Sequence, residues 1–352
     1  MNGAHPRRSG RLRDATITLA HGSGGKAMRD LIDDLFVGGY GNHILAALED
    51  QARLDLAGMA SRGDRLAMTT DSFVVDPLFF PGGDIGRLAV AGTVNDLAVG
   101  GAIPLYLSCG MILEEGLEVE ALRRVVDSMR RTAEEAEVQI VTGDTKVVHR
   151  GAADRLFINT AGIGVIPAGI DIRSDRARPG DVILVNGPIG DHGAAIVDAR
   201  GELALENTIK SDCRPLNGLI SAMLSTCPRI HCLRDATRGG IGTVLNEFAS
   251  ASGVCLRIDE RALPIRPEVR GMCEILGLDP LYLANEGKLV AVTPREHADA
   301  LLETMQRHPA GEGSTLIGEV VESPAATVVL ATAFGGERLI DMLVGEQLPR
   351  IC

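Results

Sequence analysis

The stretch Ile85–Ile112, IGRLAVAGTVNDLAVGGAIPLYLSCGMI, joins a long apolar segment to a second apolar run. Residues 85–100 predict a mostly apolar helix and residues 105–112 predict a strand. One polar pair, Asn95-Asp96, interrupts the helical pattern. An unpaired carboxylate among apolar residues is costly, so Asp96 is expected to have a metal ion or a strong hydrogen-bond partner.

Helix and strand patterns continue on both sides of this stretch. In the first half we expect a glycine-rich loop at His21–Lys26 followed by a helix, strands at Arg65–Thr70 (ending at Asp71), 137–142 (ending at Gly143-Asp144) and Phe157–Val165, and a helix at 117–136. In the second half we expect strands at 182–185, 254–258, 288–293 and 326–332, and helices at 191–200, 215–225, 240–252 and 295–307. Strands and helices alternate, but not as a run of βαβ units of equal length. The predicted class is therefore mixed α+β rather than a Rossmann sheet.

A chain of 352 residues favours two domains. We expect a disordered basic extension at 1–14, an N-terminal domain at 15–170, a C-terminal α+β domain at 171–333 and a mobile tail at 334–352. Hydrophobic residues make up 45% of the chain, but aromatic residues only 3%, and Trp is absent. The cores must therefore be aliphatic and rich in alanine.

Charge and composition exclude several classes of partner. The net charge of −12 argues against nonspecific binding to nucleic acid or to an anionic membrane. No apolar run is long enough to predict a transmembrane helix, and no apolar segment follows the N-terminal arginines as in a signal peptide.

The seven cysteines are scattered, odd in number and without a CxxC motif, which fits free thiols in a reducing cytoplasm. Cys227, His231 and Cys232 suggest a metal site only weakly, because too few ligands are visible. Buried structural thiols are the favoured interpretation.

Three acids in the first half suggest a magnesium site. Asp71, Asp96 and Asp144 follow predicted strands or interrupt the apolar helix. Magnesium prefers a few carboxylates together with water and phosphate oxygens. The alternative for Asp71 and Asp144 is turn capping, which is common for Asp beside Gly or Ser.

The loop His21-Gly22-Ser23-Gly24-Gly25-Lys26 resembles a phosphate cradle. Glycines allow backbone N–H groups to approach phosphate oxygens, and Lys26 adds a positive charge. The loop lacks the Walker A spacing, so a flexible surface loop remains the alternative.

Two segments of the second half carry further candidates. Arg234-Asp235-Ala236-Thr237-Arg238-Gly239-Gly240 precedes a predicted helix. Asp235 or Thr237 is either the N-cap of this helix or part of a phosphate or metal site. Glu286, beside Gly287, is either a general base or a solvated surface acid.

Cys352 is the last residue of the sequence and ends the segment Pro349-Arg350-Ile351-Cys352. Gly335-Gly336 makes the backbone flexible where this C-terminal segment begins. From Gly336 onward the segment can span up to roughly 50 Å when extended. The thiol could therefore reach an active site on this chain or on a neighbour. The alternative is a frayed chain end without function.

Seven motifs together resemble a known family. They are HGSGGK, TTDSFVVDP, AGTVNDLAVGGAIP, TGDTKVV, RDATRGG, ANEGKL and the terminal PRIC. The chain resembles the ATP-binding superfamily of aminoimidazole ribonucleotide synthetase and selenophosphate synthetase, and within it the carbamoyl dehydratase (HypE) family of hydrogenase maturation factors. The resemblance extends from about residue 17 to the terminus, and the PRIC ending is its most specific part.

The resemblance implies a homodimer in which the N-terminal sheets of two subunits pair into a shared barrel, with ATP in a cleft near that interface. It also implies a reaction. A carbamoyltransferase, HypF, loads a carbamoyl group onto the thiol of Cys352. ATP then phosphorylates the carbamoyl oxygen, and loss of phosphate and the N–H protons leaves a thiocyanate. The cyano group passes to iron on a HypC–HypD scaffold, toward the nickel–iron hydrogenase centre.

The resemblance also implies roles for individual residues. Asp71, Asp96, Asp144 and Asp235 would hold Mg²⁺. The nucleotide site would comprise these acids together with Gly22, Gly24, Gly25, Lys26, Asn95 and Thr145. Lys146 would stabilise charge and Glu286 would remove a proton from the carbamoyl group. A carboxylate with an ordinary pKa of about 4 is a weak base for this step, so burial or a water relay is needed.

Two alternatives have different consequences. A selenophosphate synthetase-like enzyme predicts a reactive residue near the N-terminal glycine loop, where this chain has Ser23 and no Cys. This alternative also assigns no role to the thiol of Cys352. A non-enzymatic thiol carrier switched by ATP keeps Cys352 but needs no catalytic acid.

Overall fold

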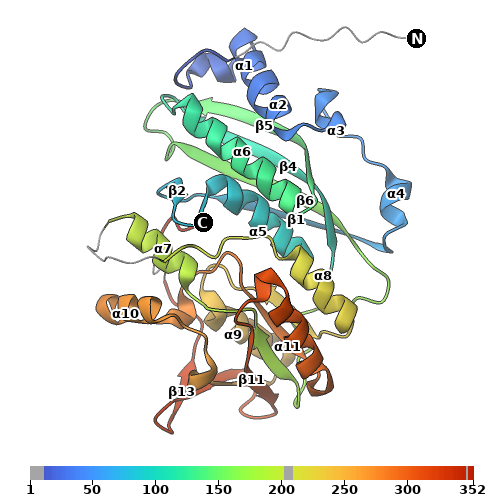
Figure 1. Ribbon diagram of the computed structural model, residues 1–352, viewed down its shortest axis with the longest axis vertical. Helices are drawn as coiled ribbons and strands as arrows, with labels where there is room; N and C mark the ends of the chain where they lie inside the picture. Colours follow the sequence, from blue (N-terminus) through green and yellow to red (C-terminus); the bar gives the residue numbers. More distant parts are fainter. Residues whose placement is uncertain (1–11, 202–208, 346–347) are drawn as a thin grey trace.

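The computed structural model describes residues 12–201, 209–345 and 348–352, which form two sheet-centred halves stacked along the long axis (Figure 1). The predicted mixed α+β class is confirmed. Each half has its own sheet, and the helices α5 and α8 lie where the halves meet. The C-terminus lies at mid-height between the halves, close to β2 and α7 (Figure 1).

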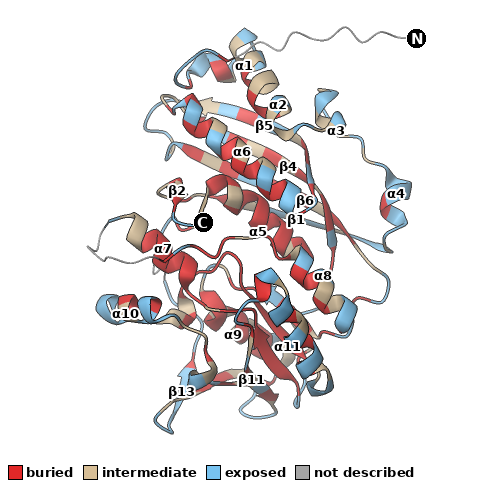
Figure 2. Ribbon diagram, in the orientation of Figure 1, coloured by how far each residue is buried: buried red, intermediate tan, exposed pale blue. Residues whose placement is uncertain are grey.

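The N-terminal half is built on a four-stranded sheet in the order β1-β6-β4-β5. The strands are β1 (Arg65–Phe73), β6 (Leu156–Ile166), β4 (Ile103–Glu114) and β5 (Gln139–Val148), and the helices over them are α5 (Ile85–Val99) and α6 (Val119–Glu135). Only β4 and β5 pair in parallel. Helix α5 is buried along nearly its whole length, because this sheet and the second half cover it from both sides (Figure 2).

Two strands extend further than the sequence predicts. β1 continues through Asp71 to Phe73, and β5 continues through Gly143-Asp144 to Val148. Asp71 and Asp144 therefore lie inside strands, and turn capping was the wrong interpretation for both. Ladder pairing extends these strands across residues whose local preference is for turns.

The N-terminal segments cover the β5 side of the sheet. They are η1 (Leu19–Gly22), a helical run of α1 (Lys26–Leu31), η2 (Ile32–Val37) and α2 (Gly38–Tyr40), and then α3 (His43–Ala46). The next helix, α4 (Leu56–Ala60), instead packs Met59 against Leu105 and Val165, and the short strands β2 (Phe79–Phe80) and β3 (Gly83–Asp84) lie between β1 and α5 in the chain. A Cβ on Gly22 would lie 2.9 Å from the backbone nitrogen of Val147, so only glycine allows this loop to lie so close to β5.

The C-terminal half contains a seven-stranded mixed sheet in the order β13-β12-β9-β11-β7-β10-β8. Its strands are β7 (Val182–Val185), β8 (Cys232–Asp235), β9 (Cys255–Asp259), β10 (Leu289–Thr293), β11 (Thr315–Val321), β12 (Thr327–Ala331) and β13 (Glu337–Ile340). Its helices are α7 (Asp191–Ala199), α8 (Asn217–Thr226), α9 (Gly240–Ser252), α10 (Pro267–Leu276) and α11 (Ala298–Arg307), with short 3-10 turns η3 (Glu260–Ala262), η4 (Pro280–Tyr282), η5 (Arg295–His297) and η6 (Pro309–Gly311). The sequence analysis missed β8, α10, β11 and β13.

Asn95 joins the two halves. Its side-chain oxygen accepts a hydrogen bond from the Leu216 N–H at 2.7 Å, and its amide donates to the Arg214 carbonyl at 3.1 Å. The polar residue inside the apolar helix therefore satisfies main-chain groups of the segment that leads into α8. The helix itself is continuous.

The segment expected to be a mobile tail differs from that expectation. Residues 337–340 form β13, which pairs with β12, and residues 348–352 lie against the body of the protein. Residues 346–347 and most of the expected basic extension, residues 1–11, lie outside the described residues. Leu12, at the end of that extension, is buried, and its N–H donates to Asp34.

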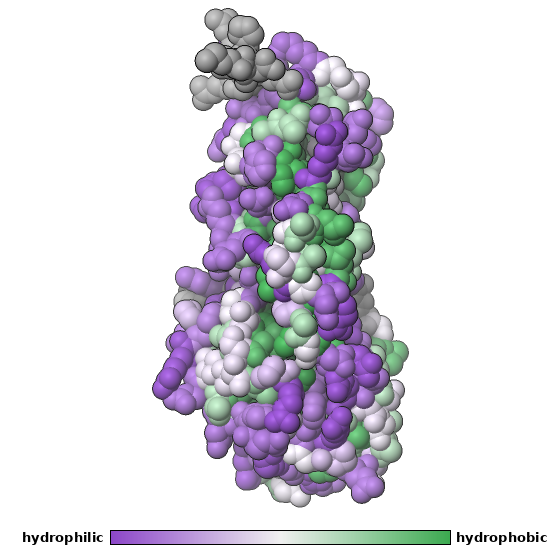
Figure 3. Space-filling view, turned by 90° about the vertical axis from the view of Figure 1, so that its right-hand side faces the viewer, coloured by the Kyte–Doolittle hydropathy of each residue, from purple (hydrophilic) through white to green (hydrophobic). Residues whose placement is uncertain are grey.

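The sheet face opposite α5 and α6 carries exposed apolar side chains. Leu66 and Met68 on β1 are 59% and 75% exposed, and Ile103 and Ile112 on β4 are also exposed. Seen from the right-hand side of Figure 1, hydrophobic side chains also gather at the surface of the upper half (Figure 3). No helix in the described part of the chain has both the length and the apolar character needed to cross a bilayer.

Candidate active site

An acid cluster lies where the two halves meet. Asp71 comes from β1, Asp96 from α5 and Asp235 from the end of β8. Thr69 donates a hydrogen bond to Asp96 at 3.0 Å. Burial raises the pKa of each carboxyl group, and the negative charges of Asp71 and Asp96 help to raise the pKa of Asp235 to about 7. The three carboxyl groups therefore lie close enough for their charges to interact.

The chemistry of this cluster fits a hard divalent cation. Repulsion between carboxylates is relieved by a cation, and Mg²⁺ needs only one or two carboxylates when phosphate oxygens and water complete its shell. Across residues 12–201, 209–345 and 348–352, no three His, Cys, Asp or Glu side chains converge closely enough to bind a metal ion by themselves.

The segment from Arg234 to Gly240 contributes Asp235 and two cations to this site, and the charge of Arg234 acts on Asp96 and Asp235. Helix α9 is capped by Gly239 in the left-handed conformation, so the N-cap interpretation of Asp235 and Thr237 was wrong. Arg234 pairs with Glu247 at 2.9 Å. The positive charge of Arg238 acts on both Asp71 and Cys352, and it lowers the pKa of each.

Glu286 and Cys352 face each other beside the acid cluster. Glu286 is 2% exposed, and its carboxyl group lies beside the Cys352 thiol, so that each group affects the ionisation of the other. Its Oε1 atom has no hydrogen-bond partner among the described residues. Burial, followed by the charges of Asp212, Asp235 and Asp71, raises the pKa of Glu286 well above its usual range. The solvated-acid interpretation of Glu286 was therefore wrong.

Cys352 is held in this position as a neutral thiol. Burial raises its pKa well above the usual range, and the carboxylates of Glu286 and Asp71 raise it further. A thiolate is the nucleophilic form of cysteine, so the docked thiol is unreactive. It lies close to an acid that can exchange protons.

The remaining candidates gather around β5 rather than around the acid cluster. Lys146 pairs with Asp144 at 2.8 Å, and this cation lowers the pKa of Asp144. Gly22 lies against Val147, and Lys26, at the start of α1, is exposed and paired with Asp30. The loop with Gly24 and Gly25 thus approaches the same strand as Asp144, Thr145 and Lys146.

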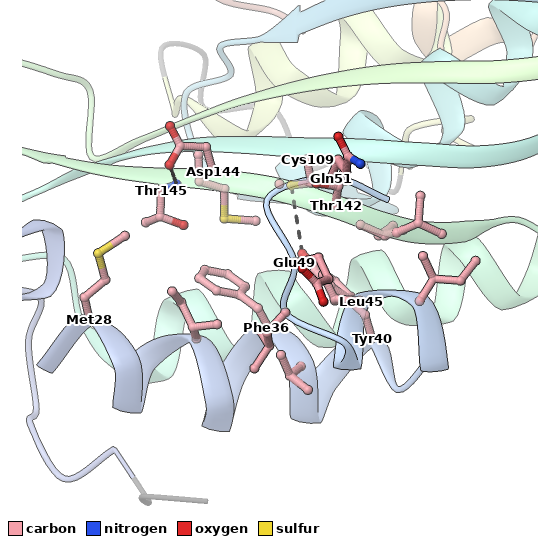
Figure 4. A pocket seen from close by; sticks show the side chains of 18 of the residues that line it. Met28, Phe36, Tyr40, Leu45, Glu49, Gln51, Cys109, Thr142, Asp144 and Thr145 are labelled. Carbon is pink, nitrogen blue, oxygen red and sulfur yellow. Dashed lines mark hydrogen bonds between the residues drawn. The ribbon is translucent and has the colours of Figure 1, made fainter. Parts of the chain in front are cut away.

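A cavity of about 250 Å³ lies beside this second group. Its walls are β5 and the N-terminal helices (Figure 4). Phe36 and Leu45 provide apolar surface, and Asp144 and Thr145 lie at one end. The Tyr40 hydroxyl lies 3.3 Å from the Met129 sulfur and 4.0 Å from the Cys109 sulfur. Glu49, Gln51 and Thr142 line the other side, so the cavity is mixed in character, and its apolar surface can pack against a flat heterocycle.

The two groups are separated within one chain. β1 and β5 are the opposite edges of the four-stranded sheet, three inter-strand steps or roughly 14 Å apart. The register also places Asp144 on the face that carries Ser72, whereas Asp71 faces α5. One chain by itself does not bring Asp144 and Lys146 to Asp71, Asp96 and Asp235.

Cys227, His231 and Cys232 do not converge as ligands. Both thiols are buried, and His231 forms a hydrogen bond with Asp181 at 2.7 Å. The structural interpretation of these cysteines therefore agrees with their surroundings.

Three buried polar residues near the site were missed by the sequence analysis. They are His192 at the start of α7, and Ser211 and Asp212 in the segment before α8. No sequence pattern marked them, because His192 and Asp212 lie beside other polar residues, Asp191, Ser211 and Arg214. Their partners are distant in sequence, at 286–287 and 351, so the motif spacing gave no indication of them.

Comparison with known proteins agrees with this architecture. The family model described as AIR synthase related protein, N-terminal domain, matches residues 48–166, and the corresponding C-terminal domain model matches residues 178–331. Carbamoyl dehydratase HypE of Rhodobacter capsulatus is 58% identical over 341 residues, which cover 97% of this chain and 99% of the relative.

Two solved structures are also similar. A hydrogenase maturation protein HypE in complex with ATP matches with a TM-score of 0.90 and 52% identity, covering 95% of this chain and 99% of that one. A HypE–HypF complex matches with a TM-score of 0.77 and 47% identity, covering 89% of this chain and 99% of that one. On this evidence of sequence and fold, the chain belongs to the HypE family of carbamoyl dehydratases, which act in hydrogenase maturation.

Proposed function

We propose that this protein uses ATP to dehydrate a carbamoyl group carried on Cys352, which yields a thiocyanate on the same sulfur. The observation that carries the proposal is the contact between the Cys352 thiol and the buried Glu286 carboxyl group, beside Asp71, Asp96 and Asp235. The sulfur that carries the substrate, an acid of raised pKa and carboxylates that suit phosphate and metal therefore lie together. We refer to the place where Asp71, Asp96, Asp235, Glu286 and Cys352 meet, between the two halves, as the crevice.

The reaction proceeds in two chemical steps. The carbamoyl oxygen attacks the γ-phosphorus of ATP, which releases ADP, and the nitrogen loses its first proton to give an O-phosphorylated imidate. Loss of the second N–H proton and departure of phosphate then form the carbon–nitrogen triple bond. Phosphorylation is needed because the oxygen of an amide is a poor leaving group.

Glu286 is the proposed proton acceptor. The sequence alone raised the difficulty that an ordinary carboxylate is a weak base. Burial raises the pKa of Glu286, which makes its ionised form a stronger base than a solvated glutamate. The contact with Cys352 places this base next to the atom that carries the carbamoyl group.

Asp71, Asp96 and Asp235 are the proposed Mg²⁺ ligands in the crevice, and Asp144 is the ligand proposed from the β5 side. Bound Mg²⁺ would supply charge neutralisation for the transferring phosphoryl group. Asn95 supports this region through its hydrogen bonds to the segment at 214–216.

The proposed catalytic unit is a homodimer. The open sheet face with Leu66, Met68, Ile103 and Ile112 has the apolar character of a surface covered by a second copy. If two such sheets close into a barrel, the β1 edge of each subunit lies next to the β5 edge of the other. That arrangement brings the two separated groups of candidates together.

ATP in this dimer would use both groups. The 250 Å³ cavity beside β5 is proposed to take the adenine ring. Gly22, Gly24, Gly25, Lys26 and Thr145 would contact the phosphates, with Lys146 stabilising charge at the reacting end. The γ-phosphate would then meet the carbamoyl group in the crevice of the other subunit.

The proposed partners follow from the chemistry of the tail. The docked thiol is neutral and half-buried beside Glu286, so a HypF-type carbamoyltransferase must load Cys352 after the tail has left the crevice. The matched HypE–HypF complex supports this partner. The cyano group would then pass to iron on a HypC–HypD scaffold.

This proposal predicts that phosphate release from ATP depends on a loaded tail. Carbamoylated protein should release one phosphate per loaded chain in a single-turnover assay, and the Cys352→Ser variant treated in the same way should release none. A carrier that uses ATP only as a switch would instead leave ATP intact while still holding the carbamoyl group.

A further inference from the structure

The docked tail is held by its backbone, by ion pairs of Arg350 with Asp154 and Asp76, and by the buried side chain of Ile351. Ile351 forms a β-bridge with Val75, and the Asp76 N–H donates to the Arg350 carbonyl at 3.2 Å. The Arg200 guanidinium donates to the carbonyls of Pro349 and Arg350. These contacts hold residues 349–351 in the crevice, and one further contact binds the carbonyl of Ile351, the residue that precedes Cys352.

The carbonyl of Ile351 is bound by His192. The Nε2 atom of this fully buried histidine lies 2.8 Å from the Ile351 oxygen, and its Nδ1 atom lies 2.8 Å from the Ser211 hydroxyl. A carbonyl can only accept, so Nε2 carries the hydrogen and the Ser211 hydroxyl donates to Nδ1. The Cys213 N–H donates in turn to the Ser211 oxygen at 3.1 Å, which completes the relay.

The same short segment also holds Glu286. The Asp212 carboxylate accepts hydrogen bonds from the backbone N–H groups of Glu286 and Gly287, at 3.0 and 3.2 Å. A Cβ on Gly287 would lie 2.1 Å from the Asp212 carbonyl oxygen, so the two backbones are in close contact. Residues 211–212 therefore support the tail through His192 and the catalytic acid through Asp212.

We infer that His192 and Ser211 are positioning residues that hold Cys352 in register with Glu286. This inference rests on the proposed function for its chemical consequence. The relay binds the peptide carbonyl immediately before Cys352, and Asp212 holds the backbone of Glu286 from the adjacent position in the same segment. The segment therefore acts as a common rigid support for the sulfur and the base, whose relative placement a dehydration step requires.

The test measures docking without relying on catalysis. The other six cysteines are buried, and docked Cys352 is half-buried and held as an unreactive neutral thiol, so the rate of N-ethylmaleimide labelling of the native protein, followed by intact mass, reports how readily Cys352 leaves its docked position. His192→Leu and Ser211→Ala are expected to accelerate labelling roughly 3- to 10-fold, as the loss of one buried hydrogen bond implies. His192→Gln, whose amide can still donate to the Ile351 carbonyl, is expected to restore slow labelling.

His297→Leu is the matched control, because this histidine pairs with Arg229 on the surface, far from the tail. It should label at the wild-type rate. Single-turnover dehydration should slow in Ser211→Ala while its dependence on ATP concentration is unchanged. Wild-type labelling rates in folded Ser211→Ala and His192→Leu would overturn the inference. If the protein were not a dehydratase, the differences in labelling rate would remain. Failure of the proposed function can therefore be distinguished from failure of the inference about His192 and Ser211.

Discussion

Glu286→Gln is expected to slow dehydration of the carbamoylated chain by about 100- to 10,000-fold, the usual contribution of a general base. Glutamine nearly preserves the shape of the buried side chain but cannot accept the proton from the carbamoyl nitrogen. Loading of Cys352 should be unchanged, because the thiol is loaded away from the crevice. The rate is measured by quenched-flow intact mass on chains loaded in advance.

Glu322→Gln provides the matched control for this variant. Glu322 is exposed in the turn between β11 and β12, and the same substitution there should leave the dehydration rate unchanged. Dehydration at the wild-type rate in Glu286→Gln would remove Glu286 from the mechanism. The proton acceptor would then be water or another group.

A heterodimer with Asp96→Asn in one subunit and Lys146→Ala in the other is expected to retain about half of the wild-type activity. The reason is the separation of the two groups of candidates across the sheet, with Asp96 near β1 and Lys146 on β5. If each active site takes Asp96 from one subunit and Lys146 from the other, one of the two sites in this heterodimer is intact. Two affinity tags allow the mixed species to be purified after co-expression.

The matched control places both substitutions in the same chain and pairs it with a wild-type subunit. Each active site, which takes Asp96 from one subunit and Lys146 from the other, then contains one substituted residue. Activity should fall close to that of the double-mutant homodimer. The reverse pattern, with activity in this control and none in the first heterodimer, would place Asp96 and Lys146 of one chain in a single site. The homodimeric part of the account would then be wrong.

Local patterns were sufficient for most elements of the fold. The apolar run at 182–185 and the helical pattern at 240–252 agree with β7 and α9 residue for residue. The missed strands β8 and β13 are short and carry charged residues, so their identity depends on pairing with β10 and β12 rather than on their own sequence. Pairing is a long-range effect that local preference does not report.

The candidate site was predictable only where residues carry distinctive motifs. Asp96 stood out because a carboxyl group in an apolar helix needs a partner, and Glu286 stood out as an acid beside a glycine in the motif ANEGKL. His192 and Asp212 have no such pattern, because their partners are peptide groups at 351 and at 286–287. The separation of Asp144 from Asp71 was also hidden, because strand order is not visible in a list of motifs.

The mass of the intact chain tests the central claim most directly. After incubation with a HypF-type carbamoyltransferase, carbamoyl phosphate and ATP, loading should add about 43 Da to the chain, and dehydration should then remove about 18 Da from the loaded species. Peptide mapping should place both changes on Cys352. A loaded mass that persists with ATP and Mg²⁺, or a loaded and dehydrated group found on a residue other than Cys352, would contradict the account.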